Sequence, residues 1–332
     1  MRAPLLQLPA KMTRPSRRQF LAASGAGAGL TYAAAPWADA APSDGQSEFR
    51  YCLNAATLRG FKLSLTDVVN VTAKAGYPAI EPWVSFIHEY ATGGGSLPDL
   101  KRRIADLGLT VESAIAFPQW VVDDPTSRAR GMEETRRDMD VVAQIGGKRM
   151  AAPPAGPSNR PVIGLKRIAE RYRAVLELGD RMGVVPELEF WGTSPHLSRL
   201  SQAASVAIET GHPKACVLPD VFHLYKGGSD FQGLRLLSGQ ALQVIHMNDY
   251  PAEPPRELIT DADRVYPGDG VAPIKHILSE LRRVAPGIIL SLELFNPAYW
   301  KGDPLDTARA GLARMKAAVR EAVRPEQQGT HS

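Results

Sequence analysis

Four ionisable residues stand at or near the ends of four apolar runs in the second half of the chain. They are Glu189 in PELEFW, Asp220 in VLPDVFH, His246 in VIHMND and Glu293 in LSLELFN. Three carboxylates and one imidazole that meet in a closed space require a compensating cation, because unpaired buried charge is costly. Oxygen ligands with one imidazole suit Mn²⁺, Mg²⁺ or Co²⁺, and Zn²⁺ also accepts such a set. We predict that these four residues bind one divalent metal ion.

Short apolar runs alternate with stretches of helical spacing along most of the chain. Strands are expected at 49–53, 79–81, 111–117, 149–152, 184–190, 215–220, 242–248 and 288–294. Helices are expected at 65–75, 97–107, 126–145, 165–182, 197–210, 231–237, 273–284 and 305–322. Eight such units predict an α/β protein with a single domain, a (β/α)8 TIM barrel over residues 49–322. An open doubly wound sheet is disfavoured, because no glycine-rich phosphate turn follows the first expected strand.

In such a barrel the active site lies at the carboxyl ends of the strands. Alternation along 288–294 places Ile289, Ser291 and Glu293 on one face and three leucines on the other. The leucine face suits burial beneath the helices, so Glu293 is predicted to point into the barrel mouth. Glu187 shares a face with Glu189, but Glu189 lies nearer the strand end and is the preferred ligand. Glu187 is expected behind that ligand or deeper in the barrel.

The beginning of the chain has the order of an export signal. Arg17 and Arg18 precede an apolar run at 21–35, which is too short to cross a bilayer that needs roughly 20 residues. A small-x-small sequence follows at 38–40. This pattern resembles the twin-arginine export signal. We therefore expect a signal peptide at 1–40, a linker at 41–48, a flexible tail at 323–332, and a mature protein that is periplasmic or secreted.

The net charge of the expected mature chain argues against nucleic acid and membranes as partners. Removing residues 1–40 takes away five of the 39 basic and one of the 35 acidic residues, which leaves 34 of each. A formal net charge of zero gives no support for binding to nucleic acid or to an anionic membrane, so we expect neither.

The two cysteines, Cys52 and Cys216, fall on strands that are not neighbours. We expect two buried thiols and no disulfide.

Five motifs resemble those of the xylose-isomerase-like barrel superfamily, the group often labelled sugar phosphate isomerases and epimerases. They are Glu-Phe-Trp at 189–191, Asp-Val-Phe-His at 220–223, His-Met-Asn-Asp at 246–249, Arg264 with Pro-Gly-Asp-Gly at 267–270, and Glu-Leu-Phe at 293–295. The resemblance covers residues 49–322. It implies one divalent metal held by Glu189, Asp220, His246 and Glu293. It also implies that Glu189 and Glu293 act as the catalytic base and acid.

The resemblance further implies contacts to the substrate. His223 and Arg264 match positions that meet the substrate in relatives. Glu81, at the end of the second expected strand, resembles a glutamate that many relatives carry, with a structural salt bridge as the alternative. Asn54 and Trp191 complete the predicted contacts. Other aromatic residues near strand ends, suited either to stacking on a sugar ring or to ordinary loop packing, are Trp83, Trp120, Phe222, Tyr299 and Trp300.

The predicted site suits removal of a proton from the carbon beside a carbonyl. Returning the proton gives an epimerase or an isomerase, and losing a β-hydroxyl instead gives a dehydratase or lyase on a keto-sugar or keto-cyclitol. A non-catalytic sugar-binding barrel is a second alternative. Nuclease relatives carry a histidine where this chain has Val265, so a DNA-repair enzyme is disfavoured. Export, together with the missing phosphate turn, favours a non-phosphorylated sugar, ketosugar, keto-glycoside or cyclitol, and oligomeric state stays open.

Overall fold

The computed structural model describes residues 49–156 and 161–324. The expected export signal, the linker and residues 325–332 of the expected tail lie outside these ranges. Within the described part, no helix is both long and apolar enough to cross a membrane.

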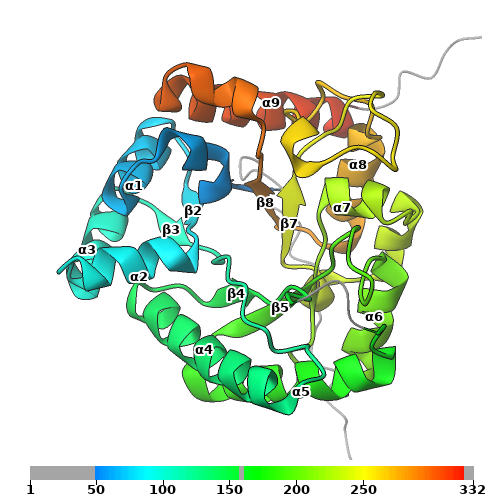
Figure 1. Ribbon diagram of the computed structural model, residues 1–332. Helices are drawn as coiled ribbons and strands as arrows, with labels where there is room; N and C mark the ends of the chain where they lie inside the picture. Colours follow the sequence, from blue (N-terminus) through cyan, green and yellow to red (C-terminus); the bar gives the residue numbers. More distant parts are fainter. Residues whose placement is uncertain (1–48, 157–160, 325–332) are drawn as a thin grey trace, which may run out of the picture. The chain divides into compact units, whose positions relative to one another are not determined.

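The described part of the chain forms a closed ring of parallel strands (Figure 1). The strands are β1 (Arg50–Asn54), β2 (Ala79–Glu81), β3 (Thr110–Val111), β4 (Arg149–Ala151), β5 (Val185–Glu189), β6 (Val217–Leu218), β7 (Val244–Met247) and β8 (Ile289–Leu292). Their order is β3-β2-β1-β8-β7 in one sheet and β4-β5-β6 in the other. Two links join the sheets: Ala151 N donates to Ala114 O at 2.8 Å, and His246 N donates to Pro219 O at 2.9 Å. The predicted (β/α)8 barrel is confirmed.

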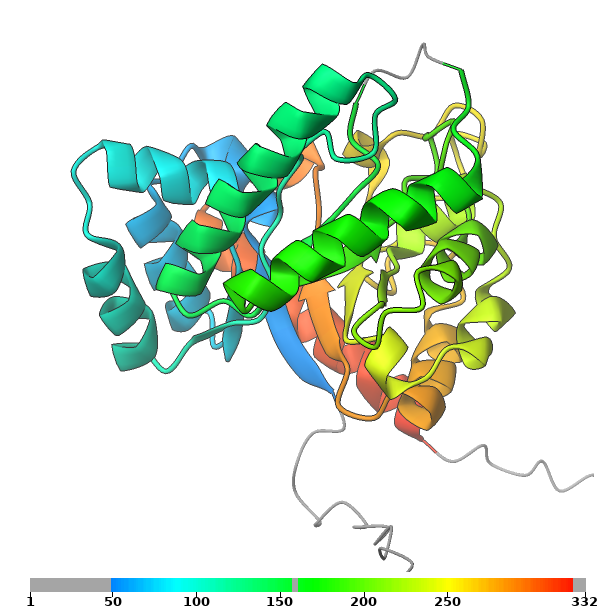
Figure 2. The same cartoon turned by 90° about the horizontal axis from the view of Figure 1, so that it is seen from below.

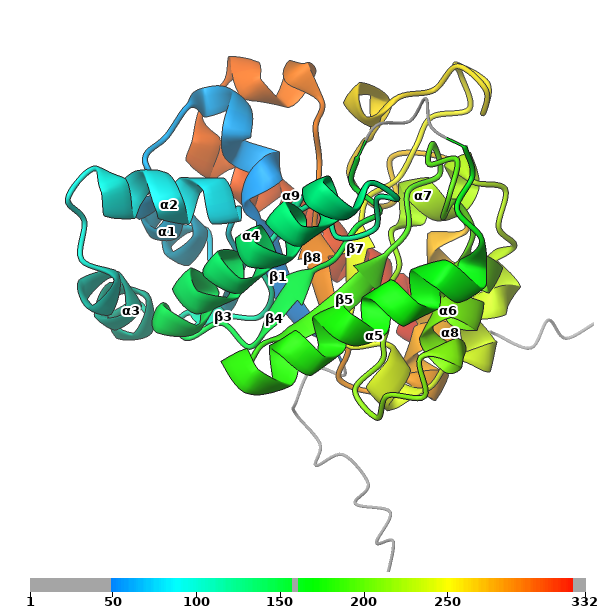
Figure 3. The same cartoon turned by 60° about the horizontal axis from the view of Figure 1, so that its bottom comes forward.

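Helices surround the strands, and the long helices α4 and α5 lie across the outside of β4 and β5 (Figure 3). The helices are α1 (Leu65–Lys74), α2 (Val84–Thr92), α3 (Leu97–Asp106), α4 (Pro125–Gln144), α5 (Leu165–Met182), α6 (Leu200–Glu209), α7 (Val221–Lys226), α8 (Ile274–Val284) and α9 (Pro304–Val323). Short 3-10 helices are η1 (Ala55–Phe61), η2 (Phe231–Leu236), η3 (Gly239–Ala241), η4 (Asp261–Asp263) and η5 (Pro297–Lys301). Every helix expected from the sequence overlaps one of these elements.

Two expected strands, those at 111–117 and 215–220, are reduced to two residues each. β6 covers two residues of the run 215–220, because Pro219 has no N–H to continue the ladder. Asp220 still pairs with His246 in an isolated parallel bridge, and Ile115 pairs with Trp83 in the same way beyond β3. The sequence patterns did not predict α2 and α7, which begin directly after strand ends. Both are short, and α7 has only six residues.

Side-chain alternation sorts the core into an inner and an outer layer. The inner cluster fills the barrel with Cys52, Ala79, Ile115, Ala151, Leu218, Val244 and Ile289. Leu290, Leu292 and Leu294 belong to the larger cluster that includes the buried residues of the helices. The predicted facing of the last strand is therefore confirmed. Figure 2 shows β8 beside β1, the pairing that closes the barrel and sets Ser291 next to Cys52.

Local features of the sequence explain where several helices begin and end. Ser64 Oγ accepts the N–H of Asp67 and begins α1, and Asp303 accepts the N–H of Leu305 at the start of α9. Helix α5 ends at Gly183, whose φ of 70° is open mainly to glycine. Both cysteines are buried and free, so the prediction of two thiols is confirmed.

Candidate metal and substrate site

Three of the predicted ligands meet at the carboxyl ends of β5, β7 and β8. Ligand atoms of Glu189, His246 and Glu293 all lie within 4.8 Å of one another, and the three residues are buried. His246 Nδ1 lies 3.3 Å from Glu293 Oε2 and 3.6 Å from Glu189 Oε1. Separations of this size fit ligands that share one ion, whose bonds are roughly 2.0–2.2 Å long.

The contacts of His246 Nε2 show which ring nitrogen is available to a metal ion. His246 Nε2 lies 3.2 Å from Glu81 Oε2, and this carboxylate fixes the proton on Nε2. Nδ1 is therefore the nitrogen available to a metal, and it is buried and has no hydrogen-bond partner in the described structure. Between two carboxylates this nitrogen needs a proton or a metal ion, and a metal ion placed there satisfies all three groups. The donor set fits a divalent ion.

Asp220 lies at the edge of this cluster. Its Oδ2 is 3.9 Å from His246 Nδ1, and it accepts hydrogen bonds from Arg264 Nη1 at 2.8 Å and Asn248 Nδ2 at 2.9 Å. Its Oδ1 accepts the N–H of His223 at 2.8 Å, which caps α7. Arg264 thus supplies positive charge at the place where the predicted fourth ligand stands. The role of Asp220 as a metal ligand stays a prediction.

The electrostatics of the cluster reflect excess negative charge in a buried space. Burial raises the pKa of Glu189 to about 7, and the carboxylates of Glu293 and Asp220 add to the rise. Burial by itself would lower the pKa of His246, but the carboxylates of Glu293 and Glu81 hold it well above its ordinary value. In the metal-free protein these groups therefore hold protons that a metal ion would displace.

Glu187 lies deeper in the barrel than the cluster. It is fully buried, and its Oε2 accepts a hydrogen bond from Ser113 Oγ at 2.8 Å. Its Oε1 has no hydrogen-bond partner in the described structure. Burial raises the pKa of Glu187 to about 7, although Arg149 opposes the rise. Of the two glutamates on this strand face, only Glu189 has an oxygen in the three-residue cluster within the described part of the chain.

Glu81 and Asn54 stand behind the ligands, fully buried. Asn54 Nδ2 donates to Glu81 Oε2 at 2.9 Å and to Glu293 Oε1 at 3.1 Å, and Ser291 Oγ donates to Glu81 at 2.6 Å. These contacts orient His246 and Glu293, a role that the sequence did not reveal. Neither Glu81 nor Asn54 lies among the residues that line the cavity above the site. Their role as substrate contacts stays a prediction.

The loop between β7 and α8 brings Arg264 over the site. Asp249 accepts backbone N–H groups from Tyr250, Gly268, Gly270 and Ala272, at 2.7 to 3.1 Å, and so folds the Pro-Gly-Asp-Gly segment back on itself. Gly270 is required there, because a Cβ atom would lie 2.2 Å from the carbonyl oxygen of Tyr250. Lys226 Nζ donates to three backbone carbonyls between 256 and 259, which secures the same loop from α7.

Arg264 is itself buried, with every side-chain nitrogen bonded. Nη1 donates to Asp220 and to Glu293 Oε2 at 2.9 Å, and Nε and Nη2 donate to Asp261 at 3.0 and 2.5 Å. His223 Nε2 lies 3.3 Å from Nη2 and accepts from it, which places the imidazole proton on Nδ1. That Nδ1 has no hydrogen-bond partner in the described residues. Burial lowers the pKa of His223, so it is neutral and offers one N–H.

A cavity of about 430 Å³ opens above the cluster. Its lining includes Glu189, Trp191, His223, Arg264 and Glu293, all of them predicted site residues. Trp83 also lines it, as one of the aromatic residues expected near strand ends. The remaining lining residues, none of which was predicted as a site residue, are Arg59, Ile115, Phe117, Thr193, Asp261 and Phe295.

Four aromatic residues expected as sugar-stacking candidates pack elsewhere. Trp120 is fully buried and donates to Pro153 O, and Trp300 donates to Thr57 O. The ring of Tyr299 is tilted against that of Tyr266, with centroids 4.2 Å apart, and Phe222 lies beneath the Arg264 guanidinium. None of the four lines the cavity. For them the packing alternative holds.

A closed parallel barrel with carboxylates, an imidazole and an arginine gathered at the carboxyl ends of its strands has the site architecture of a TIM-barrel enzyme. The chain belongs to the xylose isomerase-like TIM barrel family, whose family model matches residues 69–318.

The curated relatives are named as isomerases and a dehydratase. An inosose isomerase of Bacillus velezensis is 26% identical over 192 residues, which cover 57% of this chain and 68% of the relative. A 3-dehydroshikimate dehydratase of Pseudomonas aeruginosa is 25% identical over 245 residues, 71% of this chain and 37% of the relative. The chain thus spans about two thirds of the first relative and well under half of the second.

Solved structures agree with the fold. A crystal structure of IOLI protein with a binding zinc atom has a TM-score of 0.76 and 22% identity, covering 83% of this chain and 100% of that chain. A structure of L-ribulose 3-epimerase has a TM-score of 0.67 and 20% identity, and the match covers 82% of this chain and 95% of that chain. At these identities the likeness establishes the barrel fold.

Proposed function

We propose that this chain is an isomerase or epimerase that removes a proton beside the carbonyl of a sugar, ketosugar or cyclitol, with one divalent metal ion as its cofactor. The observation that carries the proposal is the unpartnered Nδ1 of His246 facing Glu189 and Glu293 beneath a cavity of about 430 Å³. Relatives named as inosose isomerases support the reaction class. A structural relative with a zinc atom supports the metal.

Glu189, His246 and Glu293 would hold the ion, with Asp220 as the proposed fourth ligand. Mn²⁺, Mg²⁺, Co²⁺ and Zn²⁺ are all compatible with this donor set. When bound, such an ion polarises the substrate carbonyl and stabilises the negative charge that develops on its oxygen.

The residues of the chain then divide the proton transfers between two carboxylates. An oxygen of one glutamate, Glu189 or Glu293, accepts the proton from the carbon beside the carbonyl, and the other glutamate returns a proton. The two side chains come from strands on either side of β7, so they approach the substrate from different directions. The Nδ1–H of neutral His223 donates to a substrate oxygen, and the Arg264 guanidinium keeps Glu293 and Asp220 in place.

The position of proton return decides the product. Return to the opposite face of the same carbon is epimerisation, and return to the neighbouring carbon is isomerisation. Expulsion of a β-hydroxyl from the same intermediate is dehydration. The relative named as a 3-dehydroshikimate dehydratase makes dehydration the second candidate function.

The decisive experiment combines metal analysis with solvent exchange. Purified protein loaded with each of the four metals is incubated in deuterated water with inososes, ketohexoses, aldohexoses and 3-dehydroshikimate. We expect one metal ion per chain and deuterium at the carbon beside the carbonyl of one compound class. Bound metal with no exchange in any compound would instead support the sugar-binding barrel, and three zinc ions per chain would contradict the one-metal site.

We also propose that the enzyme works outside the cytoplasm, exported through a twin-arginine signal at 1–40, on a substrate without a phosphate group. The support is the sequence order of Arg17-Arg18, apolar run and small-x-small site. Replacing both arginines by lysine should leave the precursor uncleaved in the cytoplasm. Normal periplasmic levels of the double variant would contradict the proposal.

A further inference from the structure

The cavity above the cluster has a second arginine whose setting differs from that of Arg264. Arg59 lies on η1, the segment that follows β1, and its side chain is exposed at the cavity. Its guanidinium carbon lies 4.9 Å from the ring centroid of Trp83 and 6.0 Å from that of Phe295. The guanidinium of Arg264 lies 5.0 Å from the same Phe295 ring. The two guanidinium groups therefore belong to one pocket.

The two arginines differ in what their N–H groups bind. All three side-chain nitrogens of Arg264 have hydrogen-bond partners, whereas no hydrogen bond or ion pair of the Arg59 side chain occurs within residues 49–156 and 161–324. The acidic residues that line the cavity are already engaged. Glu189 and Glu293 belong to the three-residue cluster, and Asp261 is bonded to Arg264. Within the described residues, none of these lining carboxylates forms an ion pair with Arg59.

The aromatic residues hold Arg59 in a way that leaves its donors available. Stacking on a ring uses the flat face of the guanidinium and leaves the N–H groups at its edge free to form a bidentate pair. The Trp83 ring that Arg59 stacks on is itself held in place. Its Nε1 donates to Asn54 Oδ1 at 3.3 Å, and the Phe117 ring packs edge-on against it with centroids 5.1 Å apart. Trp83 is thus tied through Asn54 to Glu81 and the ligand cluster.

We propose that the substrate of this site carries a carboxylate that Arg59 binds, so that the site takes a keto-acid sugar or a carboxylated keto-ring in preference to the neutral compound. A planar carboxylate matches the fork of a guanidinium. A phosphate is disfavoured, because one free cation and no glycine among the lining residues make a poor phosphate site. The inference depends on the proposed function only in taking the substrate to contain a carbonyl group. Binding of the carboxylate by Arg59 requires no proton transfer.

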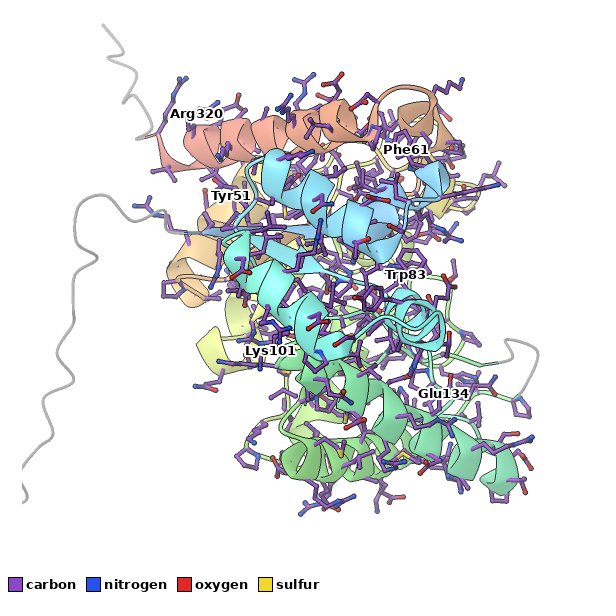
Figure 4. The ribbon with its side chains drawn as sticks, turned by 90° about the vertical axis from the view of Figure 1, so that its left-hand side faces the viewer. Tyr51, Phe61, Trp83, Lys101, Glu134 and Arg320 are labelled. Carbon is purple, nitrogen blue, oxygen red and sulfur yellow. The ribbon has the colours of Figure 1, made fainter. Side chains whose placement is uncertain are left out.

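The test uses three compounds that differ at one carbon: D-fructose, D-fructuronate and D-fructose 6-phosphate. A second comparison sets a neutral inosose against 3-dehydroshikimate. Binding to the metal-loaded full chain is measured by calorimetry for wild type, Arg59→Gln and Arg59→Lys. The matched control is Arg320→Gln, an exposed arginine on α9 that lies far from Trp83 in Figure 4 and does not line the cavity.

We expect wild type to prefer the carboxylated compound in at least one comparison. Arg59→Gln should reduce that preference about tenfold to a hundredfold, the usual effect of a hydrogen bond to a charged group. Arg59→Lys should restore part of it, because lysine keeps the charge and loses the fork. Arg320→Gln should leave the preference unchanged.

Three results would overturn the inference. The first is equal affinity of the wild type for the neutral and the carboxylated compounds, and the second is a preference for D-fructose 6-phosphate. The third is an equal loss of affinity for neutral and carboxylated compounds in Arg59→Gln, which would mean that Arg59 only packs against Trp83 and Phe295. The reaction is scored separately by deuterium exchange. A carboxylate preference without exchange in any compound would refute the proposed function and leave this inference standing.

Discussion

The two ends of the barrel each hold arginines and glutamates, but their charges are balanced differently. At the amino ends of the strands, Glu112 pairs with Arg50 at 2.9 Å and with Arg149 at 3.4 Å, and it accepts from Thr110 Oγ1 at 2.7 Å. Arg149 Nε also donates to Gln243 at 2.7 Å. One carboxylate thus has two cations and a hydroxyl. This end is complete without a ligand.

The carboxyl end has the opposite imbalance. Four buried carboxylates, those of Glu81, Glu189, Asp220 and Glu293, surround His246, and Arg264 is the cation within hydrogen-bond reach of two of them. The remaining negative charge and the unpartnered Nδ1 of His246 make this end incomplete without a cation. The comparison teaches that composition does not separate a structural cluster from a functional one, whereas the balance of charge and hydrogen bonds does.

The largest effect should come from removing the proton-carrying oxygens at the carboxyl end. Glu189→Gln and Glu293→Gln should each lower turnover by roughly 10²- to 10⁴-fold, the scale of a positioned acid or base. Glutamine keeps an amide oxygen for weak coordination, so steady-state rates are measured in excess metal. Partial exchange of substrate hydrogen with deuterated water, without net conversion, would show that the two glutamates serve different steps. Near-normal turnover in either variant would remove that glutamate from the mechanism.

Removing the imidazole should separate metal binding from folding. His246→Ala should strip or greatly weaken the bound ion, as measured by elemental analysis after dialysis, while the far-ultraviolet circular dichroism spectrum stays that of the barrel. The reason is that strand-end side chains contribute little to the apolar layers. A variant that keeps one tightly bound ion per chain would show that His246 is not a ligand.

The opposite end should respond in stability and not in metal content. Glu112→Ala leaves two arginines without their carboxylate, and we expect a loss of about 1–3 kcal/mol in the free energy of unfolding. The matched control is Glu133→Ala, an exposed residue paired within α4 to Arg136, where little or no loss is expected because solvent screens exposed ion pairs. Urea denaturation measures both. A drop in bound metal in Glu112→Ala would undo the distinction between the two ends.

The smallest effect is a pH dependence of the metal-free protein. Burial raises the pKa of Glu187 and of Glu189 to about 7, so folding favours their protonated forms. That contribution to stability is complete below the ordinary pKa of a glutamate and is lost as pH rises through about 7. The melting temperature of EDTA-treated protein should therefore fall from pH 5.5 to pH 7.5, and added metal should reduce the fall. A melting temperature that rises over this range without metal would contradict the assignment.

Strand alternation and the position of strand ends were sufficient to predict much of the site. Glu189, His246 and Glu293 follow apolar runs, and parallel strands that alternate with helices place their carboxyl ends at one side of a sheet. The facing of Ser291 and Glu293 into the barrel followed from the leucines between them. These features depend on local periodicity, which a single sequence displays.

The contacts between loops could not be read from periodicity. Four aromatic residues line the cavity, Trp83, Phe117, Trp191 and Phe295, from segments that follow four different strands. Neither Phe117 nor Phe295 was predicted as a substrate contact. Trp120 and Trp300 were stacking candidates that precede or follow strands, but they pack into the core or against η1. Which aromatic side chains reach the cavity depends on the path of the loop that carries each of them.

What the sequence determined by itself is the barrel and the set of residues at its carboxyl end, because both arise from patterns a few residues long. What only the tertiary structure decided is how those residues are paired. Glu81 orients His246 from across the barrel, Arg264 reaches Asp220 from a loop 44 residues later in the chain, and Arg59 is left without an acidic partner within the described residues. Closing the barrel brings together side chains far apart in sequence, and the balance of their charges exists only after that closure.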